Sequence, residues 1–218
     1  PHYRVVAYDR RGFGQPTGFP DPSSDPGDIK ELLDTLGIRS AVLVGHSPGA
    51  SIALRFALAH GDRVDALVLY PGAVPGFPIA PSEPSPHSGM LAVGRQYGLD
   101  SMLKFMRALP IFWNPPNRPD IERRIDAMIA TYSGRDILEG RRPMGPYPPA
   151  TFEKVKDLPM PTLFIAGERD WSHSLIVADS MSRWMPNARS VVIPGGAHGV
   201  HFAEPQRFNA VLLTFLRS

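Results

Sequence analysis

Gly45-His46-Ser47-Pro48-Gly49 is the stretch that decides how this chain folds. It follows an apolar run at 41–44 and precedes a run with helical spacing at 51–58. Small residues around a serine at a strand-to-helix junction allow the sharp turn that lifts one hydroxyl group out of the surface, the turn known as a nucleophile elbow. The context therefore predicts Ser47 as a nucleophile, whereas the bare pattern also fits an ordinary glycine-rich turn.

A nucleophilic serine needs a neighbouring base, usually a histidine that is held by a carboxylate. Two later apolar runs, at 162–166 and 190–193, predict buried strands. Asp170 follows the first run and His198 follows the second. Asp170 could instead cap the next helix, and His198 could be an ordinary loop histidine. Their positions just past strands favour a catalytic set of Ser47, Asp170 and His198.

Together with two further stretches, these motifs resemble the cap-bearing branch of the α/β-hydrolase superfamily. The further stretches are VVAYDRRGFG at 5–14 and GAHGVHFAEP at 196–205. The resemblance covers residues 3–72 and 155–217. It implies an α/β fold with a mostly parallel sheet flanked by helices and with an inserted helical cap. The order of nucleophile, acid and histidine along the chain agrees with that family.

Alternating strand and helix patterns predict two parts, an α/β-hydrolase core at 1–72 and 151–218 and a helical cap at 73–150. Six prolines at 71–86 interrupt the alternation, because proline propagates neither helix nor sheet. Helical spacing returns at 90–109 and 119–132. In the core we expect strands at 4–8, 41–44, 64–69, 162–166 and 190–193, and helices at 25–36, 48–59, 173–185 and 205–216.

In the resembled family, a strand that carries an oxyanion loop lies between the strand at 4–8 and the elbow strand. Nothing in this sequence corresponds to it. An open gap inside a sheet would leave backbone groups unpaired. We therefore expect further amino-terminal strands, on the order of 50 to 80 residues. The alternative is a sheet that has closed up without the oxyanion loop.

Composition narrows the class of protein. The chain has 218 residues, of which 43% are apolar, enough for one full core. A net charge of +2 without a basic run argues against nucleic acid as a partner. No apolar stretch approaches the roughly 20 residues that span a bilayer, so no membrane partner is expected. Oligomeric state is not indicated.

The absence of cysteine excludes disulfides and thiolate metal sites. It leaves the compartment open. The cytoplasm is the default expectation, although a leader before Pro1 would not be visible in this sequence.

No cofactor or metal is expected. His198 and His201 could form a metal pair, but no third ligand has a suitable spacing. The glycines at 12 and 14 lack the third glycine of a dinucleotide site. Asp9, Arg10 and Arg11 are interpreted as structural pairs at a turn, with a site for a substrate carboxylate as the alternative.

Methionine and aromatic side chains in the predicted cap suggest an apolar, adaptable pocket above Ser47. Most of them are expected to pack on one another, and some to cover the substrate. The predicted substrate-binding residues are His46, Pro48, Phe105, Trp113, Met144 and Trp171. An apolar small-molecule ester or lactone fits this pocket better than a sugar or a peptide.

Pro48 departs from the family pattern. The residue after the nucleophile normally donates its N–H to the oxyanion, and proline has none. Losing one donor costs about 10²- to 10³-fold in rate.

The sequence nevertheless predicts a serine hydrolase of a small to medium apolar carboxylic ester or lactone, acting through a triad and an acyl-enzyme. One alternative is an inactive or weakly active ligand-binding protein. The resemblance also leaves open a C–C bond hydrolase or a cofactor-free haloperoxidase.

Overall fold

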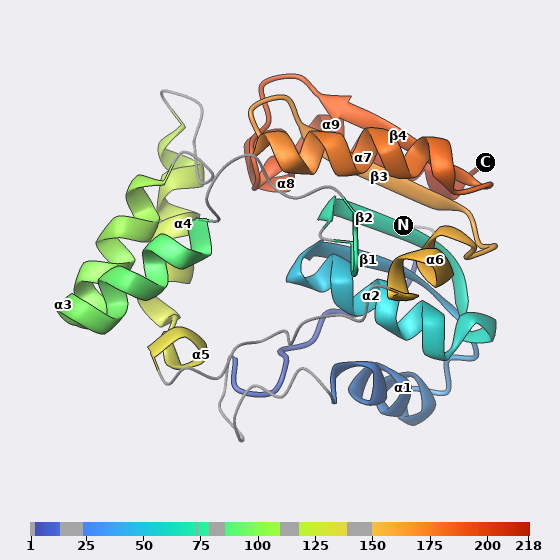
Figure 1. Cartoon of the computed structure of the whole chain (residues 1–218), viewed down its shortest axis with the longest axis horizontal. Helices are drawn as coiled ribbons and strands as arrows, with labels where there is room; N and C mark the ends of the chain where they lie inside the picture. Colours follow the sequence, from blue (N-terminus) through green and yellow to red (C-terminus); the bar gives the residue numbers. More distant parts are fainter. Residues whose placement is uncertain (1–2, 14–23, 73, 79–85, 110–117, 139–149) are drawn as a thin grey trace.

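The computed structural model describes residues 3–13, 24–72, 74–78, 86–109, 118–138 and 150–218. Its strands form one parallel sheet of four, in the order β1-β2-β3-β4 (Figure 1). Parallel strands need crossover connections, which the intervening helices supply. The strands are β1 Ala41–Ser47, β2 Val64–Gly72, β3 Thr162–Gly167 and β4 Ala188–Ile193.

Helices cover both faces of the sheet (Figure 1). The first face is covered by α1 Asp25–Thr35, α2 Pro48–Ala59, α6 Ala150–Lys156 and α7 Ser172–Trp184. The other face carries α8 Val200–Ala203 and α9 Pro205–Leu216. A short 3₁₀ turn, η1 Gly61–Arg63, leads into β2.

Side chains along β2 alternate between the two faces, as the period of two in a strand requires. Leu67 and Leu69 belong to the hydrophobic cluster on the first face. Val68 and Tyr70 belong to the cluster on the second face. The α/β fold class with a parallel, helix-flanked sheet is thereby confirmed.

The described residues between β2 and β3 are mainly helical, as expected for an insertion. It contains α3 Pro86–Ala108, α4 Pro119–Thr131 and α5 Arg135–Leu138. α3 is kinked at Gly98, where φ is 80°. These helices lie on the side toward which the carboxyl ends of the strands point (Figure 1). The exact division into core and cap stays a prediction.

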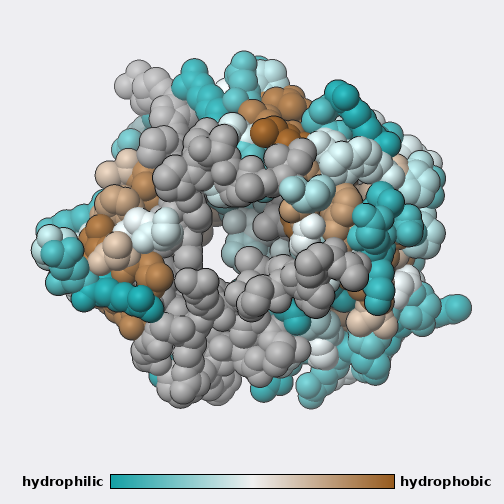
Figure 2. Space-filling view, viewed as in Figure 1, coloured by the Kyte–Doolittle hydropathy of each residue, from teal (hydrophilic) through white to brown (hydrophobic). Residues whose placement is uncertain are grey.

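Most of the described surface seen in Figure 2 is hydrophilic, and apolar residues gather on the side of α3 and α4. Tyr97 and Met128 are among the large apolar side chains that are exposed there. In the described part of the chain, no helix has the length and apolar character needed to cross a membrane.

The predicted strand at 4–8 is wrong. The segment has no strand assignment, and its side chain at Val5 is 86% exposed. A strand is stabilised by pairing with a neighbour, and β1 pairs only with β2 among the described residues. The alternative in which this segment closes up against β1 is therefore also wrong.

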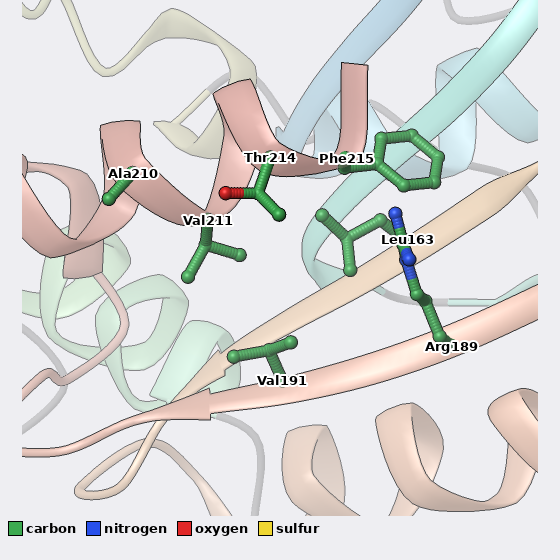
Figure 3. A pocket seen from close by; sticks show the side chains of 7 residues that line it. All are labelled: Leu163, Arg189, Val191, Ala210, Val211, Thr214 and Phe215. Atoms are coloured by element: carbon green, nitrogen blue, oxygen red, sulfur yellow. The ribbon is translucent and has the colours of Figure 1, made fainter. Parts of the chain in front are cut away.

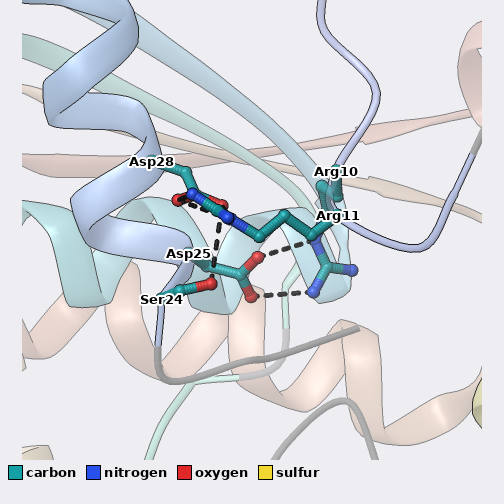
Figure 4. Close-up of polar contacts among 5 residues, drawn as sticks. All are labelled: Arg10, Arg11, Ser24, Asp25 and Asp28. Atoms are coloured by element: carbon teal, nitrogen blue, oxygen red, sulfur yellow. Dashed lines mark hydrogen bonds and ion pairs between the residues drawn. The ribbon is translucent and has the colours of Figure 1, made fainter. Parts of the chain in front are cut away.

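The described segment 3–13 is instead held against α1 by two ion pairs (Figure 4). The Arg10 guanidinium donates to both carboxylate oxygens of Asp25 at 3.1 and 2.7 Å, and Arg11 pairs with Asp28 at 2.7 Å. Asp25 is buried, so its pairing avoids an uncompensated charge. The interpretation of Arg10 and Arg11 as structural pairs is confirmed, and that of Asp9 stays a prediction. Ser24 occupies the N-cap position of α1.

The junction between β1 and α2 depends on a very close backbone contact. A Cβ atom at Gly45 would lie 2.5 Å from the carbonyl oxygen of Gly49, closer than real Cβ atoms approach. A Cβ atom at Gly49 would meet nothing within 4 Å among the described residues. The two glycines of the pentapeptide therefore have different roles, and only Gly45 is required by packing.

We expect Gly45→Ala to lower the free energy of unfolding by about 2 to 3 kcal/mol, because the added methyl group would push α2 away from β1. Gly49→Ala is the matched control and should change it by less than about 0.5 kcal/mol. Urea unfolding followed by circular dichroism measures both. Equal destabilisation by the two substitutions would contradict the contact.

Candidate active site

Ser47 lies in a strained turn between β1 and α2. Its φ is 52° and its ψ is −114°, and it is the one non-glycine residue with positive φ in the described part of the chain. Such conformations cost about 1 to 3 kcal/mol and persist only where the surroundings fix them. The close contact at Gly45 provides that constraint. The turn has the geometry that the pentapeptide predicts.

The predicted catalytic residues lie together at the carboxyl edge of the sheet. Ser47 ends β1, Asp170 follows β3, and His198 follows β4. Nε2 of His198 lies 2.9 Å from Oγ of Ser47. Nδ1 of His198 lies 3.1 Å from Oδ1 of Asp170. These distances join the three side chains in one hydrogen-bonded series.

The direction of each hydrogen bond follows from the chemistry of the groups. An ionised carboxylate only accepts, so Nδ1 of His198 carries the hydrogen and donates it to Asp170. Nε2 is then unprotonated and accepts from the Ser47 hydroxyl group. The Asp170 side chain is fully buried and that of His198 is 12% exposed. The imidazole is therefore oriented to take a proton from Ser47.

Asp170 is held in place by its own turn. Its Oδ1 also accepts the backbone N–H of Trp171 at 2.7 Å. Its Oδ2 is buried and has no hydrogen-bond partner among the described residues. The carboxylate thus presents one oxygen to both donors, which fixes its orientation toward the imidazole.

The turns after β3 and β4 are joined by backbone contacts. The N–H of Arg169 donates to the carbonyl oxygen of Gly196 at 2.8 Å, and the N–H of Gly195 donates to Oε2 of Glu168 at 2.9 Å. A Cβ atom at Gly167 would lie 2.5 Å from the carbonyl oxygen of Ala197. These contacts fix the separation of the carboxylate from the histidine.

His46 lies in a half-buried cluster of rings beside the site. Its Nε2 is 3.0 Å from the backbone carbonyl oxygen of His198. The centroid of its ring lies 5.2 Å from that of Tyr70 and 4.9 Å from that of His201. Burial lowers the pKa of His46 to about 3 and that of His201 to about 4, with the neighbouring His198 adding to both shifts. Both rings are neutral at neutral pH.

The other predicted substrate-binding residues are dispersed. Pro48 is exposed at the first position of α2. Trp171 precedes α7 and contacts His173 with ring centroids 5.5 Å apart. Phe105 lies in α3, and its ring approaches Gly89 of the same helix. Trp113 and Met144 lie outside the described residues. Substrate contact at each of these residues stays a prediction.

A pocket of about 300 Å³ lies between α9 and the strands β3 and β4 (Figure 3). Leu163 and Arg189 place it near the amino ends of these strands. The catalytic candidates lie at the opposite, carboxyl edge. This pocket therefore contains none of the residues predicted for catalysis. Its lining is Leu163, Arg189, Val191, Ala210, Val211, Thr214 and Phe215.

The interpretation of the sequence missed two residues that shape the site. Glu168 ties the turn after β3 to the turn after β4. Tyr70 is the register partner of His46 on the adjacent strand and packs against its ring. Pairing the predicted strands in parallel would have brought Tyr70 beside His46. Within the described residues, no group of three or more histidine, cysteine, aspartate or glutamate residues is placed to hold a metal ion.

Comparison with known proteins agrees with this geometry. Residues 1–211 match the model of the alpha/beta hydrolase family. The RutD protein of Caulobacter sp., named as a candidate carbamate hydrolase, is 29% identical over 98% of this chain and 81% of its own length. The 2-hydroxy-6-oxononadienedioate/2-hydroxy-6-oxononatrienedioate hydrolase of Paraburkholderia phymatum is 30% identical over 98% of this chain and 76% of its own length.

Solved structures give the same fold. An esterase from Exiguobacterium antarcticum superposes with a TM-score of 0.80 at 21% sequence identity, covering 96% of this chain and 80% of that one. The resemblance inferred from the motifs is confirmed. The chain belongs to the alpha/beta hydrolase family.

Proposed function

We propose that this chain is a serine hydrolase that cleaves small to medium apolar carboxylic esters or lactones through an acyl-enzyme on Ser47. The observation that carries the proposal is the hydrogen-bonded series from Ser47 through His198 to Asp170. A hydroxyl group becomes nucleophilic when an oriented base removes its proton. The strained turn at Ser47 further supports this role.

In the proposed mechanism, Oγ of Ser47 attacks the substrate carbonyl carbon while Nε2 of His198 takes the hydroxyl proton. Asp170 holds the imidazole in the required tautomer and stabilises the imidazolium ion. The histidine then returns the proton to the leaving alcohol, and the acyl-enzyme forms. Water, activated by the same histidine, releases the acid and restores Ser47.

The oxyanion of the tetrahedral intermediate needs donors other than residue 48. Pro48 occupies the first position of α2 and has no N–H. Two other groups at the start of α2 could stabilise the oxyanion. They are the N–H of Gly49, one residue further along, and the positive end of the helix dipole. Weaker stabilisation at this point would favour the alternative of a ligand-binding protein with little turnover.

A second candidate activity is the hydrolysis of C–C bonds. It is favoured by the hydrolase of Paraburkholderia phymatum, at 30% identity. Ester hydrolysis is preferred because the insertion offers apolar and aromatic side chains that suit an apolar acyl group. Assays with p-nitrophenyl esters of increasing chain length and with a vinylogous diketone distinguish the two activities.

Labelling by a serine-directed phosphonate tests the nucleophile directly. We expect the wild-type chain to gain one phosphonyl group on Ser47, located by mass spectrometry of peptides, and Ser47→Ala to gain none. Binding of the probe without covalent labelling would support the ligand-binding alternative and contradict the proposed hydrolase.

Substitution of the triad should remove ester hydrolysis. We expect Ser47→Ala and His198→Ala each to lower kcat by about 10⁴-fold or more, because members of a triad act as a unit. Asp170→Asn should leave a small residual rate. His201→Ala is the control, since His201 has no hydrogen bond to either Ser47 or Asp170 among the described contacts. Equal losses at the two histidines would show that the base is wrongly identified.

Replacing Pro48 should raise the rate. Pro48→Met restores an N–H after the nucleophile, so kcat toward an ester should increase by up to about 10²-fold if that N–H reaches the oxyanion. KM should stay unchanged, because stabilisation confined to the transition state acts on kcat. A lower kcat in a folded variant would mean that other donors already hold the oxyanion. A change in both constants would instead indicate a reshaped pocket.

A further inference from the structure

His46 makes a contact that the proposed mechanism does not use. Its side chain reaches the backbone carbonyl oxygen of His198 at 3.0 Å. A carbonyl oxygen only accepts, so Nε2 of His46 carries a hydrogen and donates it. This hydrogen bond joins the residue before the nucleophile to the peptide of the base. It therefore connects the two elements whose side chains must meet.

The orientation of the His46 ring is fixed from several sides. Tyr70 of β2 lies 5.2 Å away between ring centroids, and His201 of α8 lies 4.9 Å away. The ring of His198 is also near, at 5.1 Å and edge-on. Tyr70 and His201 pack in turn against Phe208 of α9. A ring held in this way can donate in one direction only.

Other hydrogen bonds also hold the turn that carries His198, but they involve its neighbours Gly195, Gly196 and Gly199. Glu168 binds the N–H of Gly195, and Arg169 binds the carbonyl oxygen of Gly196. Gly199 accepts from Phe202 at 2.8 Å. The bond from His46 is the described contact that holds the carbonyl of His198 itself. A small rotation of that peptide would move the imidazole relative to Ser47.

The charge state of His46 suits this task. Burial is the largest cause that lowers its pKa to about 3, and the nearby His198 and His201 lower it further. These two histidines and Tyr70 are the titratable groups that contact its ring. A neutral His46 keeps its donor on Nε2 without placing a positive charge beside the imidazolium ion that forms on His198.

We propose that His46 is a positioning residue, which holds the peptide of His198 so that the imidazole stays between Ser47 and Asp170. The inference rests on the proposed function, since it concerns the geometry of the same site. It assigns to His46 a role that acts through the base rather than through contact with the substrate.

The test compares His46→Leu, which removes the donor, with His46→Gln, whose amide N–H has a similar reach. We expect His46→Leu to lower kcat by about 10- to 100-fold with KM nearly unchanged, because small misplacements of a catalytic group have effects of this size. His46→Gln should recover most of that loss. His60→Leu is the matched control, because it removes a histidine that contacts Phe56 at the far end of α2, and its kcat should stay within roughly threefold of wild type.

The rate of phosphonate labelling distinguishes failure of the positioning role of His46 from failure of the proposed hydrolase function. If the wild-type chain is labelled and His46→Leu is labelled at the same rate, the positioning role is overturned while the proposed function stands. If the wild-type chain is not labelled, both are overturned.

Circular dichroism and urea unfolding identify variants that have lost the fold. If His46→Leu does not fold, His46→Gln alone provides the test. A kcat of His46→Gln that is lower than that of wild type by about 10-fold or more would then contradict the role of the donor. A rise in KM without a fall in kcat for either variant would mean that His46 contacts the substrate instead, and would also overturn the proposal.

Discussion

The approach of helix α2 to strand β1 at Gly45 is the contact on which the site depends. A hydrogen atom is all that fits between the Cα of Gly45 and the backbone of Gly49, because a methyl group there would lie 2.5 Å from a carbonyl oxygen. That proximity leaves Ser47 no relaxed backbone conformation between strand and helix. The residue takes a φ of 52°, and its hydroxyl group is directed toward the imidazole at 2.9 Å. The tight packing beneath this turn therefore sets where the hydroxyl group of Ser47 lies.

A second close contact sets the other half of the site. Gly167 at the end of β3 touches the backbone at Gly196 and Ala197 after β4. Because β3 and β4 are adjacent and in register, their following turns meet at the same edge of the sheet. Backbone hydrogen bonds then lock the carboxylate turn to the histidine turn. In both places a glycine is required for its small size, and a catalytic candidate lies two or three positions further on.

Much of this could be predicted from the sequence, because the signals are local. The helix at 48–59 was predicted with the bounds observed for α2, and the strands of the sheet were found from their apolar runs. The catalytic candidates were found because each follows such a run. What the sequence could not supply is pairing between distant segments. The run at 4–8 has the composition of a strand, yet no described segment pairs with it, and its side chains are exposed. Ion pairs from Arg10 and Arg11 to α1 hold this segment, in place of the backbone hydrogen bonds that a sheet would supply.

The ring cluster around His46 is a second feature that could not be predicted from the sequence. Its members come from β1, β2 and α8 and have no common spacing in the sequence, so no pattern in the chain indicates them. The pentapeptide does show that residue 46 precedes the nucleophile, but the side chain direction depends on the register of β1 with β2.

Pro48 adds a constraint of a different kind to the elbow. Its ring fixes φ at the first position of α2 and restricts the residue before it, which is the strained Ser47. The same ring removes the N–H that would point toward a developing oxyanion. In the proposed mechanism, one residue therefore both restricts the backbone of Ser47 and removes a donor to the oxyanion. Geometry at Ser47 determines how often the hydroxyl group is aligned with His198. In the proposed mechanism, the number of oxyanion donors determines how far the barrier falls once it is aligned, by about 10²- to 10³-fold in rate per donor.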